Sequence, residues 1–155
     1  MEDDRQTTGG CLCGAIRYEF DGPPDWVAHC HCATCRKHVS SPLATVVGIG
    51  RGRFRFTRGQ PRIYVSSPGV RRSFCAECGS PIAHEADRLP DEIHLYHGTL
   101  DDPGALEAEA HVHAGEQLPW FEVHDSLPRY EAGGRGGTRP IRRGPRRAPD
   151  SVGRR

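Results

Sequence analysis

The sequence predicts an all-β fold: a single domain over residues 7–131, followed by a disordered tail over residues 132–155. Three observations predict it: short runs of alternating or β-branched residues, turn-forming clusters between these runs, and few signs of helix. The 155 residues include 19 Gly and 13 Pro, about a fifth of the chain, and this composition disfavours long helices.

The first expected strand covers residues 11–20, because its large apolar residues share one parity and Cys11, Cys13, Arg17 and Glu19 take the other. The large apolar residues are Leu12, Ile16, Tyr18 and Phe20. Residues 43–49 form an apolar, β-branched run, and residues 53–56 alternate Arg with Phe. Gly, Pro, Ser and Asp clusters separate the remaining expected strands at intervals of roughly 8–12 residues, which is typical of a compact sheet or barrel. These strands are residues 62–66, 70–74, 81–84, 92–97 and 109–113.

Two short helical segments are also expected. The sequence Asp101-Asp102-Pro103 can cap and begin one helical turn, and residues 32–39 are expected to form another. No internal repeat is visible.

The charge of the chain is divided between two opposite parts. Residues 1–131 carry 13 Lys and Arg against 19 Asp and Glu, whereas residues 132–155 carry eight Arg against one Asp. The second part has no aromatic residue and cannot bury enough apolar surface to offset its ordering entropy, which predicts a disordered Arg-, Gly- and Pro-rich tail. The acidic balance of the domain disfavours a nucleic-acid-binding face on it.

The N-terminal segment is acidic and polar and lacks the basic and apolar regions of a signal peptide. No apolar run approaches the roughly 20 residues that a membrane helix needs. We therefore expect a cytoplasmic protein that makes no membrane contact.

The seven cysteines fall into three tight groups: Cys11 and Cys13; Cys30, Cys32 and Cys35; Cys75 and Cys78. An odd number of cysteines in a chain that is not exported argues against disulfides and for metal ligands or reactive thiols. Clustered thiolates at these spacings suit zinc, which takes four ligands tetrahedrally.

Cys75 and Cys78, followed by Gly79, resemble a zinc knuckle, in which a glycine permits the positive φ that the turn needs. Cys11 and Cys13 are expected on one strand face, and the two pairs together would close a structural zinc site. The remaining three cysteines leave a fourth position on a second zinc open, which is typical of catalytic zinc. The alternative is that a histidine closes this second site and both zincs only stabilise the domain.

Five sequence stretches carry a resemblance to a known family: GGCLCGAIRY (9–18), HCHCATCRK (29–37), SSPGVRRSFCAECGSPI (66–82), GTLDDP (98–103) and LPWFEVHDSLPRY (118–130). In order and spacing they resemble the glutathione-dependent formaldehyde-activating enzymes, whose domain also occurs in centromere protein V. The resemblance covers about residues 8–130. It implies a β-tent fold and two Zn²⁺ ions per chain.

The resemblance also implies the ligands and the activity. It assigns Cys11, Cys13, Cys75 and Cys78 to a structural zinc, and Cys30, Cys32 and Cys35 to a catalytic zinc. The activity that it implies is of carbon–sulfur lyase type, in which glutathione adds to formaldehyde and gives S-hydroxymethylglutathione. A small thiol such as glutathione would then be the substrate partner.

Two function classes follow for this chain. The first is a zinc enzyme that acts on a small thiol or a thiol–aldehyde adduct, with Arg36 and Lys37 as candidate substrate-binding residues because they follow the last cysteine of the open site. The second is a non-catalytic, zinc-stabilised binding module whose basic tail contacts nucleic acid or another acidic partner. Trp120 and Phe121 are expected to pack in the core.

The histidines add further candidates. His29 and His31 flank Cys30, and on a strand they would share the face opposite to it. His111 and His113 share a parity, as metal ligands could, but we expect them at the surface. His94 and His97 differ in parity, so at most one of them should face the site.

Overall fold

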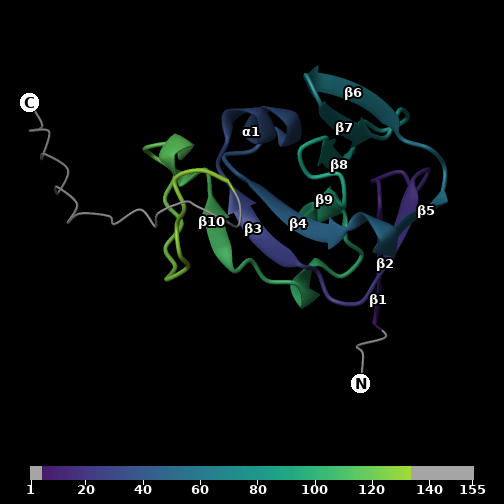
Figure 1. Ribbon diagram of the computed structural model, residues 1–155, viewed down its shortest axis with the longest axis horizontal. Coiled ribbons are helices and arrows are strands. Elements are labelled where there is room, and N and C mark those ends of the chain that lie inside the picture. The colour runs from purple at the N-terminus through teal and green to yellow at the C-terminus, as the bar shows by residue number, and fades with distance from the viewer. Residues whose placement is uncertain (1–4, 134–155) are drawn as a thin grey trace, which may run out of the picture.

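The computed structural model describes residues 5–133 and is mostly β with one short α-helix, which confirms the β prediction in outline (Figure 1). The strands are β1 Gln6–Gly10, β2 Arg17–Asp21, β3 Trp26–Cys30, β4 Ala44–Gly50, β5 Phe54–Arg58, β6 Arg62–Ser67, β7 Val70–Phe74, β8 Pro81–Ala86, β9 Glu92–Tyr96 and β10 Ala110–Val112. The α-helix is α1 Ala33–Val39, and the 3-10 turns are η1 Arg51–Arg53, η2 His97–Thr99, η3 Pro103–Ala105 and η4 Ala114–Glu116.

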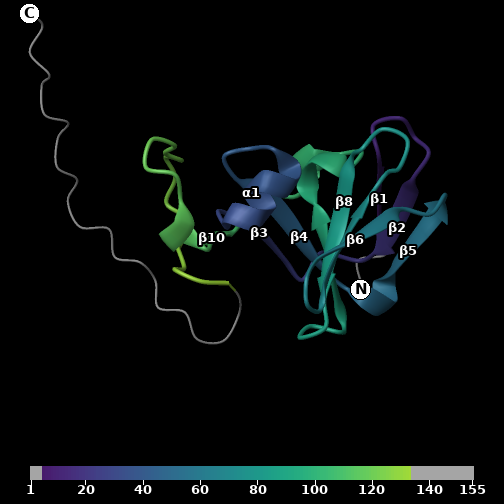
Figure 2. The ribbon, with the colours of Figure 1, turned by 90° about the horizontal axis from the view of Figure 1, so that it is seen from above.

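The strands form two sheets. The smaller has the order β1-β2-β5, and the larger has the order β10-β3-β4-β9-β8-β7-β6. All neighbouring strands are antiparallel except β10 and β3, which run parallel. The small sheet lies at the opposite end of the molecule from β10 in both views (Figures 1 and 2).

The core lies where the two sheets face each other. Tyr18 and Phe20 from β2 and Phe54 from β5 pack with aliphatic residues of the large sheet, such as Val47 and Leu95. Their burial follows the two-residue alternation of a strand with one covered face. A second apolar cluster lies under α1 and includes Cys30, Cys35, Ala44, Val46 and Tyr96.

The expected strand over residues 11–20 is wrong in its first half. Residues 11–16 form the turn of the β1–β2 hairpin, closed by hydrogen bonds from Cys11 N to Ile16 O (3.0 Å) and from Gly14 N to Cys11 O (3.1 Å). Leu12 is 90% exposed at the tip of this turn, so its parity with the buried residues was coincidental. Sequence reasoning also missed β1, which has no large apolar residue, and β3.

Both predicted helical segments are confirmed. The helix expected over residues 32–39 is confirmed as α1, with Cys32 as its N-cap. The turn expected after Asp101 is confirmed as η3, which has Pro103 at its start.

Residues 1–4 and 134–155 lie outside the described part of the chain, and with them nearly all of the predicted tail. Within residues 5–133, no helix has both the length and the apolar character needed to cross a bilayer.

Asp101 ties the η2–η3 segment to the β1–β2 hairpin. It accepts hydrogen bonds from the Thr8 hydroxyl (2.6 Å) and from Arg17 Nη1 (2.9 Å), and Arg17 Nη2 also contacts it. The Arg17 guanidinium and the Thr8 hydroxyl lower the pKa of Asp101 to about 2. A carboxyl whose folded pKa is lowered stabilises the fold fully above its ordinary pKa of about 3.9, and this contribution is lost progressively as the pH falls from there through about 2.

Asp101→Asn is therefore expected to lower the free energy of unfolding by no more than about 1 kcal/mol, because exposed ion pairs are screened by water. The loss should be constant from pH 5 upward and should shrink in high salt. Urea unfolding at several pH values and salt concentrations measures it. Asp102→Asn, at the exposed neighbouring position, is the matched control. Equal effects of the two substitutions would contradict the assignment to the Arg17 pair.

Candidate active site

Four cysteines from two turns come together although 62 residues separate the turns. Cys11 and Cys13 come from the β1–β2 turn, and Cys75 and Cys78 from the β7–β8 turn, with all four sulfurs within 4.8 Å of one another. The Cys11 and Cys13 sulfurs are 3.6 Å apart, and those of Cys13 and Cys75 are 3.8 Å apart. A tetrahedral zinc with Zn–S bonds of about 2.3 Å separates its sulfurs by about 3.8 Å. The cluster therefore has the spacing of a closed zinc site.

Hydrogen bonds hold these sulfurs in place. Ile16 N donates to Cys11 Sγ (3.2 Å), and the Ser80 hydroxyl lies 3.2 Å from Cys78 Sγ while it accepts from Leu12 N. Ser80 thus links the two turns, and sequence reasoning did not identify it. Its hydroxyl and backbone lower the pKa of Cys78 to about 5, which favours the thiolate. Gly79 has φ +76°, as expected for a knuckle turn.

The second cluster stands where β3 meets α1. Cys30 ends β3, Cys32 caps α1 and Cys35 lies in its first turn, with their sulfurs within 4.8 Å of one another. Cys35 N donates to Cys32 Sγ (3.3 Å), and the Thr34 hydroxyl is 3.4 Å from the same sulfur. Contacts among the three thiols raise the pKa of Cys30 and lower that of Cys32. Three thiols this close can all ionise only around a cation, so the cluster could hold a metal ion.

Arg72 on β7 supplies a positive charge beside this cluster. Its Nη1 lies 3.8 Å from Cys35 Sγ and donates to the Tyr96 hydroxyl (2.7 Å), and its Nε donates to Ser66 Oγ (3.1 Å). Arg72 is only 6% exposed, and within residues 5–133 it forms no ion pair with a carboxylate. A buried guanidinium needs an anionic partner. Three thiolates around a divalent cation would carry one net negative charge, which Arg72 would balance.

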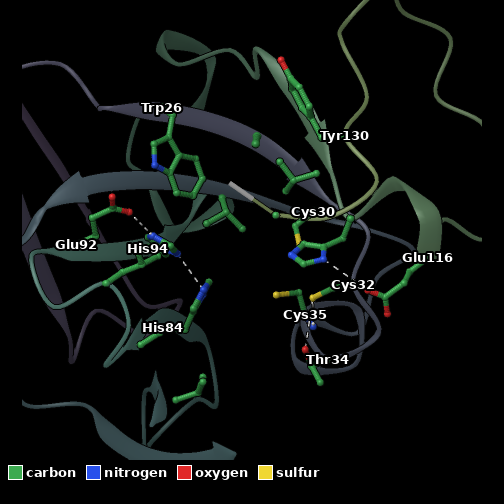
Figure 3. A pocket seen from close by; sticks show the side chains of 18 of the residues that line it. Trp26, Cys30, Cys32, Thr34, Cys35, His84, Glu92, His94, Glu116 and Tyr130 are labelled. Atoms are coloured by element: carbon green, nitrogen blue, oxygen red, sulfur yellow. Dashed lines mark hydrogen bonds and ion pairs between the residues drawn. The ribbon is translucent and has the colours of Figure 1, made fainter. Parts of the chain in front are cut away.

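A cavity of about 830 Å³ opens in front of the three cysteines (Figure 3). This volume lies in the range of small-molecule sites, about 300–1,000 Å³. Trp26, Ala28 and Val46 supply apolar wall, and the segment after η4 contributes Tyr130. Charged side chains and histidines also line the cavity: Arg72, Arg88, His84, His94, His113, Glu92, Glu109 and Glu116.

A hydrogen-bonded chain of Glu92, His94 and His84 runs along one wall of the cavity (Figure 3). Glu92 Oε2 lies 2.8 Å from His94 Nε2, and His94 Nδ1 lies 3.0 Å from His84 Nε2. Because a carboxylate accepts hydrogen bonds, His94 carries its proton on Nε2 and donates it to Glu92. Its Nδ1 then accepts a hydrogen bond from Nε2 of His84. Burial and the neighbouring His94 lower the pKa of His84 to about 3, so His84 is neutral near pH 7.

The candidate substrate residues Arg36 and Lys37 lie apart from this wall. Arg36 Nε donates to the carbonyl of His31 (2.9 Å), Lys37 is exposed on α1, and neither lines the cavity. Arg72, which was not assigned from the sequence, is the cationic side chain that contacts the three-cysteine cluster. Its parity with Val70 and Phe74 on an expected strand was the signal that could have found it.

The structure also decides where two further pairs of candidate residues lie. Trp120 is 71% exposed, so its expected place in the core is wrong, whereas Phe121 is half-buried. Only one of the pair His94 and His97 lines the cavity, as parity required, because His97 Nε2 contacts the Leu106 carbonyl instead (2.7 Å).

The histidines around Cys30 follow strand parity. Cys30 lines the cavity while His29 and His31 do not, and His31 Nε2 contacts His111 Nδ1 (2.8 Å). His111 is fully buried, which corrects its expected surface position, because its ring stacks on His31 and contacts Asp125 in the segment that follows η4. His113 lies beyond the end of β10 at φ +51° and is partly exposed.

The fold and the two clusters define a mostly β protein with two sets of cysteine side chains that could each hold a metal ion. Residues 6–116 match the family model described as glutathione-dependent formaldehyde-activating enzyme. Because the match spans more than half of the chain, the protein belongs to this family, and the resemblance read from its motifs is confirmed.

Individual relatives agree with this family. A protein of Halomonas elongata is 26% identical over 126 residues, which cover 74% of this chain and 79% of that protein; its name gives glutathione-dependent formaldehyde-activating enzyme as a provisional assignment. The crystal structure of a Rhodobacter sphaeroides protein matches with a TM-score of 0.54 at 22% identity, over 65% of this chain and 96% of that one. At this identity the second likeness concerns the fold alone.

Proposed function

We propose that this protein is a zinc-dependent enzyme of carbon–sulfur lyase type that acts on a small thiol or a thiol–aldehyde adduct. The prototype is the addition of glutathione to formaldehyde, which gives S-hydroxymethylglutathione. The observation that carries the proposal is the three-cysteine cluster, which faces a cavity and is backed by the buried guanidinium of Arg72.

Cys30, Cys32 and Cys35 would hold the zinc and leave its fourth position on the cavity side. A zinc ion held there would supply a lowered pKa for an incoming thiol and polarisation of a nearby carbonyl. In the reaction the sulfur forms a bond to the aldehyde carbon, the carbonyl π bond breaks, and the thiol proton is matched by one taken up at the carbonyl oxygen. Atoms and charges balance without an oxidant or a reductant.

The cavity wall suits a thiol that carries charges of both signs. Arg88 can attract a carboxylate, and Glu109 and Glu116 can attract an ammonium group. Glutathione has two carboxylates and one ammonium group. Trp26 lies on the apolar wall of the cavity, where its ring contacts that of His94 edge-on (ring centroids 4.7 Å apart).

Cobalt spectroscopy tests the proposal on the full chain. With Co²⁺ in the cysteine clusters, glutathione is expected to change the sulfur-to-metal charge-transfer bands of the three-cysteine site and to release protons near pH 7, because a free thiol has a pKa of about 8.5. S-Methylglutathione, which lacks the thiol, is the control ligand. Cys35→Ser should abolish the response.

The alternative, a zinc-stabilised binding module, makes the opposite prediction. If a histidine closes the second site, thiols should leave the spectrum unchanged, and no S-hydroxymethylglutathione should accumulate faster than without protein. Flat titrations with glutathione and with several other small thiols would overturn the enzyme proposal and favour this module.

A further inference from the structure

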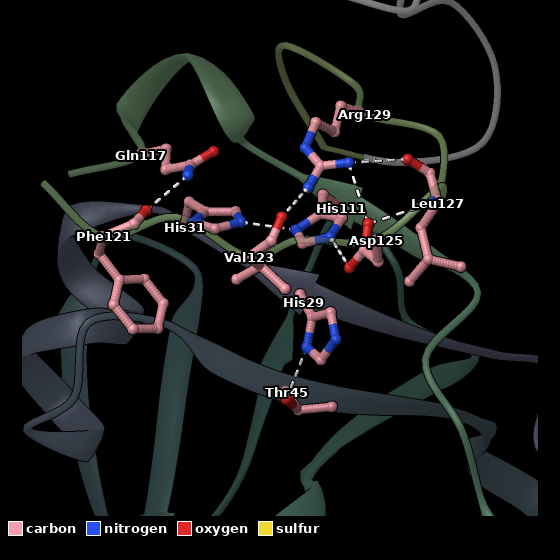
Figure 4. A network of polar contacts seen from close by, with 10 residues as sticks. All are labelled: His29, His31, Thr45, His111, Gln117, Phe121, Val123, Asp125, Leu127 and Arg129. Atoms are coloured by element: carbon pink, nitrogen blue, oxygen red, sulfur yellow. Dashed lines mark hydrogen bonds and ion pairs between the residues drawn. The ribbon is translucent and has the colours of Figure 1, made fainter. Parts of the chain in front are cut away.

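A third cluster of metal-ligating side chains lies on the face of the large sheet that points away from the cavity. His29, His111 and Asp125 place one ligand atom each within 4.8 Å of one another (Figure 4). The parallel register of β3 and β10 puts His29 directly beside His111, with ring centroids 4.9 Å apart. Asp125 comes from the loop that follows η4. The cavity is lined by Ala28, Cys30, Ala110 and Val112 of the same two strands, so the cluster is separated from it by the sheet itself.

Each of the three side chains is held through the atom that would not bind a metal. His29 Nδ1 contacts the Thr45 hydroxyl (2.8 Å), and His111 Nδ1 contacts His31 Nε2 (2.8 Å), so each ring directs Nε2 to the cluster. Asp125 Oδ1 accepts from Leu127 N (3.1 Å) and from Arg129 Nη1 (3.0 Å), while its Oδ2 lies 2.9 Å from His111 Nε2. Metal-binding histidines and carboxylates in proteins are held in this way by a partner on the second atom.

We propose that His29, His111 and Asp125 form a further site for a divalent transition-metal ion of the zinc class. Two imidazoles and one carboxylate are donors that zinc accepts, and unlike the cysteine clusters this set contains no sulfur. His111 is fully buried, whereas the side chain of Asp125 is 23% exposed, so an ion there would keep a position open to solvent. The donor atoms come from two rigid strands and one loop.

The site would act as a clamp on the C-terminal part of the domain. Asp125 belongs to the same segment as Pro128 and Tyr130, which line the cavity on the other side of the sheet. This segment contacts β10 through hydrogen bonds from His111 N to Pro128 O (2.8 Å) and from Tyr130 N to His111 O (2.9 Å). A metal ion bound to Asp125 would also fix the loop that carries this residue. The proposal stands whether or not the thiol reaction proves correct.

Metal titration of the full chain tests this proposal. Wild-type protein is expected to bind three Co²⁺ equivalents, of which two show sulfur-to-metal charge transfer and the third adds ligand-field absorption without it. Asp125→Asn keeps an oxygen that can accept hydrogen bonds from Leu127 and Arg129 but removes the negative charge. It should weaken binding of the third Co²⁺ ion by at least about 10–100-fold. His29→Gln should act in the same way. The two cysteine-bound equivalents should persist in both variants, which also reports that they fold.

The control is His124→Asn, at a side chain that neighbours Asp125 in sequence and is 79% exposed. It should bind three equivalents, as the wild type does. A wild-type protein that saturates at two equivalents would overturn the proposal and leave a hydrogen-bonded His–Asp network. A third equivalent that survives unchanged in both Asp125→Asn and His29→Gln would overturn the ligand assignment.

Discussion

Replacing Cys75 or Cys78 by Ser is expected to remove one cysteine-bound zinc and to unfold the domain. The four-cysteine cluster joins the β1–β2 turn to the β7–β8 turn, which belong to different sheets. Apparent zinc-binding free energies of about 10–16 kcal/mol equal or exceed the total stability of a typical domain, about 5–15 kcal/mol. With zinc in this cluster, loss of the ion would remove as much free energy as the fold has in reserve.

Cys35→Ser should behave differently. Its cluster joins only β3 to the adjacent α1, so the variant should lose the metal of that cluster and keep more of the fold. Elemental analysis together with thermal melting by circular dichroism separates the two cases. Ala76→Ser, at an exposed position between the two ligands of the β7–β8 turn, is the control. A Cys75→Ser variant that melts like the wild type, or a zinc-replete wild type that holds no more than one zinc, would contradict the division into two cysteine sites.

Arg72→Met is expected to weaken metal binding at the three-cysteine site by about 10–100-fold, the usual effect of removing a partner that supports metal ligands. Without the guanidinium, residues 5–133 offer no other cationic side chain in contact with Cys35 to balance the net negative charge of three thiolates and a divalent ion. Competition with a chromophoric chelator measures the affinity. The four-cysteine site should be unaffected.

Arg71→Met is the matched control for this prediction. Arg71 is the preceding residue on β7, but its side chain is 40% exposed and pairs with Asp87 (2.6 Å). Arg72→Lys keeps the positive charge without the planar fork and should fall between the wild type and Arg72→Met. Equal metal affinities in Arg71→Met and Arg72→Met would show that the buried charge does not support the cluster.

The sequence by itself determined the grouping of the cysteines, the family and the β character of the chain. Ligands with only one or two residues between them can reach a common ion from a single turn of the chain, so Cys30, Cys32 and Cys35 could be assigned to one cluster without a structure. Short alternating runs between Gly and Pro clusters likewise specify strands locally. Local parity also placed His29 and His31 opposite Cys30.

Only the tertiary structure decided which strands are neighbours. The two-residue period of a strand tells which side chains share a face, but not which strand lies beside it. Arg72 reaches Cys35 because β7 and β8 continue the sheet beyond β9, and His111 reaches His29 because β10 pairs parallel with β3 from some 80 residues away. Cys11 and Cys13 sit in a turn rather than on a strand because the chain reverses there to close the β1–β2 hairpin. These contacts depend on pairing between distant segments, which local periodicity does not encode.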